Sequence, residues 1–274
     1  MSVTKLVASV IVVCSVLTVS AHLIVFLSVF FKCEWRQKSG LQLILSLTVS
    51  DCPTCAAKGA GALCALIGWH QPSFSSSVAA VVTGGWFSLC FHLITLAVNR
   101  FVAVCFPGSF DYIFSHQTTT KIVTVIWSLI LLAVLPVVTV SCCLFVYDFN
   151  TLTTITNEEH FLLPYVYLMA VLGLCSVIIP SVFYLAVFAE LYRQKRSNAQ
   201  SSVDVSLCLQ FAVILFCHLF MVFLFNLIPR ITEPGSDWFY LISVGSFVEF
   251  GGNPVVYFVW NKSIRDGFKK LLGF

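Results

Sequence analysis

The stretch SLCLQFAVILFCHLFMVFLFNLI, residues Ser206–Ile228, decides the fold class. It contains no Asp, Glu, Lys or Arg, and it is longer than the roughly 20 apolar residues that an α-helix needs to cross a bilayer. Apolar and polar residues do not alternate in it, as they would in a strand of a membrane barrel. Because lipid cannot hydrogen-bond a free backbone, we expect this stretch to be a membrane-spanning helix.

Six further runs are also predominantly apolar and long enough to cross a bilayer, and the gaps between the runs hold most of the polar residues. These runs are Leu6–Phe31, Leu41–Ile67, Val78–Cys105, Thr119–Val146, Leu163–Tyr192 and Asp237–Trp260. The first could instead be a cleaved signal peptide, but its apolar part continues too far beyond the small residues near position 20. The sequence therefore predicts an all-α fold, a seven-transmembrane bundle in residues 1–260, followed by a cytosolic segment in 261–274.

The composition excludes other classes of protein. Hydrophobic residues make up 59% of the chain and charged residues only 10%, whereas soluble domains carry about 25% charged residues. The net charge of +3 gives no reason to expect nucleic-acid binding. The chain lacks paired-histidine boxes, a Gly-x-Ser-x-Gly elbow and a phosphate-binding glycine loop. We therefore expect no metal, no cofactor and no enzymatic activity.

The basic residues predict the orientation in the membrane. Twelve of the 15 lysines and arginines fall in or beside the first, third and fifth gaps and the C-terminal segment. Cytosolic segments carry this excess of positive charge. We therefore expect an integral plasma-membrane protein with its N-terminus outside and its C-terminus in the cytosol.

The C-terminal segment has the pattern of an amphipathic helix. Ile264, Phe268, Leu271 and Leu272 recur at helical spacing, and four basic residues lie among them. Such a helix lies on the inner leaflet, with its apolar face in contact with membrane lipid and its charges toward the headgroups.

Three local motifs resemble those of rhodopsin-like G-protein-coupled receptors. Asn99-Arg100-Phe101 ends the third span in the manner of an Asp-Arg-Tyr motif, Asn253-Pro254-Val255-Val256-Tyr257 ends the seventh, and Asp51 lies in the second span. The Asn-Arg-Phe variant and the residues around it resemble the nematode chemosensory serpentine receptors, specifically class X. The family usually has a cysteine bridge between the third span and the second extracellular loop, and the required cysteines are missing here.

This resemblance implies roles for individual residues. Asn99, Arg100, Asn253, Pro254 and Tyr257 would serve activation and the coupling to a heterotrimeric G protein. Asp204 is the preferred acidic partner of Arg100, with Glu190 as the alternative. Asp51 would hold sodium or a water network with Asn253, or else be a protonated, hydrogen-bonded carboxyl.

The ligand site is expected in the outer half of the bundle. The candidates, chosen by depth, are Lys58, Trp86, His92, His218 and Glu249, although ordinary packing also explains Trp86 and the two histidines. Ionisable groups in hydrocarbon are costly, so we expect Lys58 and Glu249 to pair. The alternative is that Lys58 extends outward alone and Glu249 is protonated.

The leading prediction is a chemoreceptor that binds a small extracellular molecule and activates a G protein, in a sensory cilium if the resemblance holds. A transporter or channel is the alternative, but no internal repeat relates the two halves of the chain. A retinal-based light sensor would need a lysine in the seventh span, and Asp237–Trp260 has none.

Overall fold

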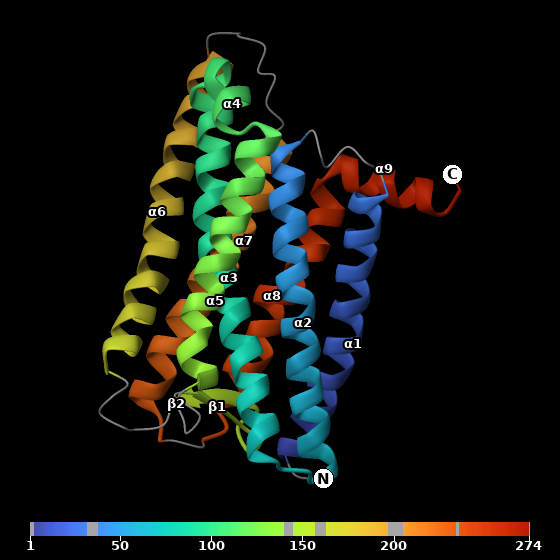
Figure 1. The fold of residues 1–274 in the computed structure, drawn as a ribbon, viewed down its shortest axis with the longest axis vertical. Helices are drawn as coiled ribbons and strands as arrows, with labels where there is room; N and C mark the ends of the chain where they lie inside the picture. Colours follow the sequence, from blue (N-terminus) through green and yellow to red (C-terminus); the bar gives the residue numbers. More distant parts are fainter. Residues whose placement is uncertain are drawn as a thin grey trace.

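Seven long helices form a bundle in the computed structural model, which describes residues 3–31, 38–139, 145–156, 163–196, 205–233 and 236–273. They are α1 (Val3–Phe30), α2 (Ser39–Ile67), α3 (Pro72–Cys105), α5 (His116–Thr139), α6 (Leu163–Arg196), α7 (Val205–Ile231) and α8 (Phe239–Trp260). All seven run along the long axis of the molecule (Figure 1). The predicted all-α seven-helix bundle is confirmed.

Five of these helices are long and apolar enough to cross a membrane by length and composition within the described residues: α1, α3, α5, α6 and α7. The remaining two, α2 and α8, are of similar length and carry the buried carboxyl groups of Asp51 and Glu249 and the half-buried Lys58. Their lower apolarity has a structural cause, because these charged side chains face the bundle rather than lipid.

The two ends of the bundle carry different small elements. The short helices α4 (Pro107–Ile113) and α9 (Lys262–Leu271) lie at one end, and the strands β1 (Phe145–Asp148) and β2 (Thr153–Thr156) lie at the other, with the N-terminus (Figure 1). The first end is the one that the positive charges assign to the cytosol. The same prediction places the strands at the outer end.

The fourth span is shorter than the sequence indicates. We predicted a helix through Val146, but residues Phe145–Asp148 form a strand that pairs antiparallel with Thr153–Thr156. Phe145 and Tyr147 are buried, whereas Val146 and Asp148 are only partly buried. This alternation is the two-residue period of a half-buried strand. A four-residue alternation directly after a long apolar run gives too weak a signal to mark the end of a helix.

Hydrogen bonds hold this hairpin against the bundle, and its described residues, 145–156, include no cysteine. Ser75 Oγ at the start of α3 donates to the carbonyl of Tyr147 at 2.8 Å, and Ser243 Oγ of α8 donates to the carbonyl of Leu152 at 2.7 Å. The Tyr147 ring fits against Gly61 of α2, where a Cβ would lie 2.6 Å from Tyr147 Cε1. Burial raises the pKa of the Tyr147 hydroxyl, so the ring stays neutral.

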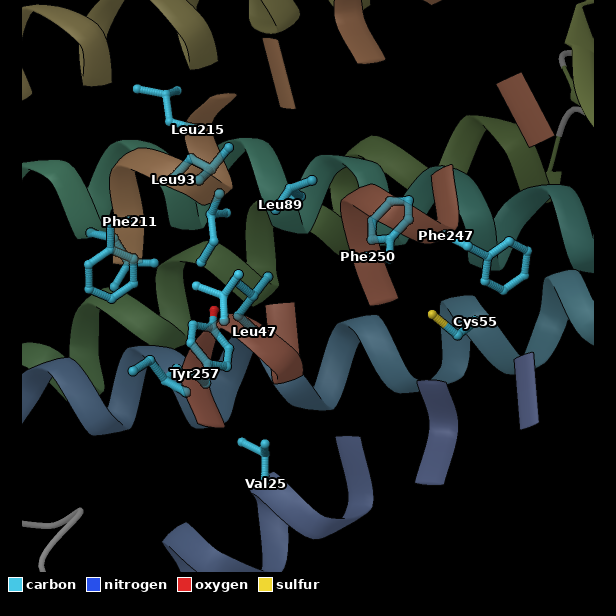
Figure 2. Close-up of a cluster of buried hydrophobic side chains, with 14 of the residues drawn as sticks. Val25, Leu47, Cys55, Leu89, Leu93, Phe211, Leu215, Phe247, Phe250 and Tyr257 are labelled. Atoms are coloured by element: carbon cyan, nitrogen blue, oxygen red, sulfur yellow. The ribbon is translucent and has the colours of Figure 1, made fainter. Parts of the chain in front are cut away.

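Helix α3 is the central element, and it contacts α2, α5, α6 and α7. The main apolar cluster fills the space between these helices and α8 (Figure 2). Leu47, Leu93, Phe211, Leu215 and Tyr257 point toward one another there from α2, α3, α7 and α8. Dense packing of this kind keeps water out of the bundle interior.

Helix α9 is amphipathic, as predicted, and it docks on the cytosolic ends of α1 and α8. Asn261 Oδ1 accepts from the Ile264 backbone amide at 3.3 Å and so caps its first turn. Ile264 is fully buried, and the Phe268 ring lies 5.1 Å from that of Phe258. Gly267 lies directly on the Ser28 backbone carbonyl, where a Cβ would be 3.1 Å from the carbonyl carbon.

Gly267→Val should lower the free energy of unfolding by about 1–3 kcal/mol, because a backbone carbonyl cannot move aside for the new side chain. Gly108→Val is the matched control, since a Cβ at this α4 glycine meets nothing within 4 Å. Thermal unfolding of the purified variants in detergent measures the difference. Equal midpoints for the two variants would contradict the docking of α9 on α1.

Candidate functional site

A buried polar contact joins α2 to α8 at mid-depth. Asn253 Nδ2 donates to Asp51 Oδ2 at 2.7 Å, and both side chains are buried. Asp51 Oδ1 is also buried and has no hydrogen-bond partner among the described residues. This oxygen can accept a hydrogen bond from a water or contribute a ligand to a small cation.

One to two turns further out, a chain of hydrogen bonds joins α6, α7 and α8. His218 Nδ1 lies 2.6 Å from Glu249 Oε1, and His218 Nε2 lies 2.7 Å from Ser176 Oγ. His218 and Ser176 are fully buried and Glu249 nearly so. A polar side chain that is removed from water needs such partners, so this chain fixes the three helices relative to one another.

Lys58 does not pair with Glu249 in this structure, contrary to our prediction. Its ammonium group donates to Ser246 Oγ, one turn outward from Glu249 on α8. The Phe247 and Phe250 rings lie 6.0 and 5.6 Å from Lys58 Nζ. The expected pair does not form because Glu249 Oε1 contacts His218 and the Lys58 ammonium group contacts Ser246.

Two other candidates contact different parts of the bundle. His92 is fully buried, and its Nε2 lies 2.9 Å from Ser46 Oγ of α2, so it faces α2 and α5 rather than Lys58 and Glu249. Trp86 packs edge-on against Phe87 with 5.4 Å between the ring centroids. Its ring also lies against Gly173 of α6. The structure therefore brings together Lys58, His218 and Glu249 and turns His92 toward α2. Trp86 lies beside Gly173, whose carbonyl accepts from the Ser176 hydroxyl that contacts His218.

At the cytosolic end, Arg100 lies among side chains from α2 and α7. Its guanidinium carbon is 5.4 Å from the centroid of the Phe211 ring, within the range of a cation–π contact. Its Nη2 atom lies so close to Gly40 that any side chain at position 40 would overlap it. The neighbouring Asn99 donates from Nδ2 to Ser39 Oγ at 3.0 Å.

Tyr257 belongs to the same region, because its ring meets Phe211 edge-on at a centroid distance of 6.5 Å. Figure 2 shows both rings in the apolar cluster, together with Leu47, Leu93 and Leu215. Along the helices, the part of this cluster that these five residues form lies between the Asp51–Asn253 contact and Arg100, whereas Cys55, Phe247 and Phe250 extend the cluster beyond that contact. Apolar side chains thus separate the polar interior from the cytosolic surface.

Of the two candidate acidic partners of Arg100, the structure describes only Glu190. Glu190 is occupied by its own helix, since its Oε2 lies 2.8 Å from Arg193 Nε and its Oε1 accepts from Gln194. Asp204, the preferred candidate, lies outside the described residues.

A family model described as the serpentine type 7TM GPCR chemoreceptor Srt matches residues 1–274, the whole chain. The chain belongs to this family. It is therefore a G-protein-coupled receptor, and the transporter alternative is not favoured. The matching model is Srt, so it confirms a serpentine chemoreceptor but not the assignment to class X.

The receptor is also similar to the melatonin receptor type 1B-B of Danio rerio. The two are 23% identical over 289 residues, which cover 97% of this chain and 81% of the relative. A match of this extent to a vertebrate receptor agrees with the motifs in the third and seventh helices.

Sequence reasoning missed the serines that complete the receptor's buried contacts. Ser176, Ser246 and Ser243 accept or donate hydrogen bonds inside the bundle. A serine within an apolar helix is also tolerated when it bonds to its own backbone one turn earlier, as Ser181 does with Val177. The spacing of serines along one helix does not show whether a serine bonds to another helix or to its own backbone.

Removing one partner of the His218–Glu249 contact should destabilise the receptor more than removing both. Glu249→Leu leaves a buried imidazole nitrogen without its partner, which costs about 1–3 kcal/mol. The double variant His218→Leu, Glu249→Leu removes both polar groups and should recover most of that loss. Thermal unfolding in detergent provides the comparison. The single variant His218→Leu completes the comparison. If the losses of stability in His218→Leu and Glu249→Leu add up to the loss in the double variant, the contact is excluded.

Proposed function

We propose that the receptor binds a small extracellular molecule in the outer half of the bundle, between α2, α6, α7 and α8. The observation that carries this proposal is the group of polar side chains at that depth, in which Ser246, His218 and Glu249 are buried and Lys58 is half-buried. Lysine has three donors, and one of them is used by Ser246. Glu249 Oε2 is buried with no hydrogen-bond partner among the described residues. A ligand with a hydrogen-bond acceptor and a donor can therefore accept from the Lys58 ammonium group and donate to Glu249 Oε2.

The same site communicates with the deeper contact. Glu249 lies four residues outward from Asn253 on α8, about 6 Å at the helical rise of 1.5 Å per residue. A ligand that draws Glu249 away from His218 would shift α8 and, with it, the Asn253 amide on Asp51. We propose that Asp51 and Asn253 hold a sodium ion or a water network, whose loss accompanies activation.

The β-hairpin covers the outer end of this site, so the ligand enters when the hairpin moves. Its hydrogen bonds to Ser75 and Ser243 are neutral, and each contributes only about 0.5–1.5 kcal/mol. No covalent bridge opposes the movement among the described residues. The melatonin receptor in the comparison is named for a small ligand, which agrees with a small molecule here.

Coupling to the G protein is assigned to Arg100, with Asn99, Asp204, Asn253, Pro254 and Tyr257 as the supporting residues. Phe211 of α7 covers the Arg100 guanidinium. An outward movement of α7 would withdraw this ring and open the guanidinium to a partner in the cytosol. Asn99 is neutral and bonded to Ser39, so it supplies no charge to hold Arg100.

The experiment is an odorant screen in cells that express the receptor with a promiscuous G protein. An active compound should lose its effect on Arg100→Ala, with surface expression retained, because the coupling group is gone. Arg193→Ala is the matched control, since Arg193 is an exposed arginine at the cytosolic end of α6 that pairs with Glu190. It should respond like the unaltered receptor.

The same screen tests the ligand site. Lys58→Met should raise the concentration for a half-maximal response by about tenfold, the loss of roughly 1.4 kcal/mol of ligand contact. Signalling that persists in a well-expressed Arg100→Ala variant would remove the coupling role. An unchanged potency in Lys58→Met would move the ligand away from this lysine.

We further propose a plasma-membrane location with the N-terminus outside, and a nematode sensory cilium as the resemblance to chemosensory receptors suggests. The basic residues support this orientation. An N-terminal epitope tag should be stained in intact cells and a C-terminal tag only after permeabilisation. The reverse pattern would invert the topology.

A further inference from the structure

The buried hydrogen-bond chain between α6, α7 and α8 has the order of a nucleophile, a base and an acid. Ser176 Oγ lies 2.7 Å from His218 Nε2, and His218 Nδ1 lies 2.6 Å from Glu249 Oε1. Both distances are within the reach of about 2.6–3.2 Å that joins an activated nucleophile to its base. The two ring nitrogens are used as in a serine–histidine–carboxylate triad, which is recognised by its geometry and not by sequence position.

The partners of the three groups allow the proton positions that a nucleophile needs. A carboxylate only accepts, so with Glu249 charged we place the His218 proton on Nδ1 and the Nε2 lone pair toward Ser176. The Lys58 ammonium group contacts α8 one turn outward and supplies positive charge near this carboxylate. The Ser176 hydroxyl can donate to His218 Nε2 or to the Gly173 carbonyl at 2.8 Å. Donation to the imidazole prepares the oxygen for attack.

A second serine–histidine contact in the bundle shows what distinguishes the first. Ser46 Oγ lies 2.9 Å from His92 Nε2, but His92 Nδ1 faces the Ser88 backbone carbonyl at 2.8 Å. A carbonyl oxygen carries no net charge, so it stabilises the imidazolium formed on proton transfer less than the Glu249 carboxylate does. Ser46 Oγ also receives the Trp127 indole N–H at 3.0 Å, which engages one of its lone pairs. The carboxylate therefore marks the contact between α6, α7 and α8 as the nucleophilic one.

The position of Ser176 limits the chemistry to a single transfer. It lies within α6, where the backbone amides bond to carbonyls one turn earlier, so this helix supplies no amides for an oxyanion hole. A carbonyl compound must therefore bring a good leaving group of its own in order to react. Ser176 and His218 are fully buried, so bulk water does not reach an acyl group at this place and the product persists. The expected outcome is a modified receptor and not a turnover.

We infer that Ser176 is a site of covalent modification, at which a small activated ester transfers its acyl group to the serine hydroxyl. Ser176 Oγ forms a bond to the carbonyl carbon, and the bond from this carbon to the leaving oxygen breaks. His218 Nε2 takes the hydroxyl proton and returns it to the leaving oxygen, while Glu249 stabilises the imidazolium. The products are an acylated receptor and a free alcohol. Access to Ser176 rests on the proposed function, because the ester enters by the route of the ligand.

The test uses the purified receptor in nanodiscs and p-nitrophenyl acetate, whose leaving group is coloured. The receptor should release p-nitrophenolate in a burst without steady turnover. Mass spectrometry should find the acetyl group on the α6 peptide that contains Ser176. Ser46 has an imidazole without a carboxylate, and the Ser181 hydroxyl bonds to its own helix. Both are controls within the same molecule and should be acetylated at least about tenfold more slowly, since they lack the complete set of partners.

Three variants separate reactivity from packing. Ser176→Ala removes the nucleophile and should abolish acetylation of its peptide. His218→Gln keeps Ser176 and a polar neighbour but removes the base, so it should slow the acetylation of Ser176 by about 100-fold. Ser181→Ala is the matched control on the same helix and should react like the unaltered receptor. Thermal unfolding in detergent identifies the folded variants, and the comparison of serines within the unaltered receptor applies even where a variant does not fold.

Three results would overturn the inference. The first is acetylation of Ser176 in the unaltered receptor that is absent or no faster than that of Ser46 and Ser181. The second is an unchanged rate at Ser176 in a folded His218→Gln receptor. The third is an acetyl group on Lys58 in place of Ser176, which would make the lysine the nucleophile. None of these readouts uses G-protein signalling, so this test and that of the proposed function fail separately.

Discussion

A polar side chain inside the hydrocarbon core is out of reach of bulk water and must find most of its hydrogen-bond partners within the protein. This constraint accounts for the arrangement of the receptor's helices. Asp51 is bonded to Asn253 between α2 and α8, and His218 joins Glu249 of α8 to Ser176 of α6. These contacts fix which faces of the apolar helices point inward. The packing of the apolar side chains then follows from them.

The constraint also explains what the sequence could and could not predict. The spans follow from hydropathy alone, since 20-residue apolar runs have no other stable form in lipid. The contact between Asp51 and Asn253 was expected from the resemblance to rhodopsin-like receptors, in which these two motif positions share a sodium site or a water network. The partner of Glu249 did not follow, because α7 is apolar on all sides and its sequence does not show that His218 faces inward. The hairpin was missed because its alternation covers only four residues.

The buried contacts lie at two levels that an apolar layer separates from the cytosol. The group of Lys58, His218 and Glu249, where we propose that the ligand binds, lies on one side of the Asp51–Asn253 contact, and Phe211 and Tyr257 cover Arg100 on the other side. A packed layer of this type has discrete arrangements and does not deform continuously. Movement of α7 would change the His218 contact and the Phe211 cover together, since both residues belong to that helix. This gives a physical link between the ligand site and the coupling site.

The most direct test of this link is guanine-nucleotide exchange on a purified heterotrimeric G protein by the receptor in nanodiscs without ligand. His218→Asn shortens the side chain that joins α7 to α6 and α8. The account predicts that it raises basal exchange by several-fold, and that adding Arg100→Ala to it returns exchange to the level of the G protein alone. Basal exchange unchanged in a folded His218→Asn receptor, or retained in the double variant, would contradict the account.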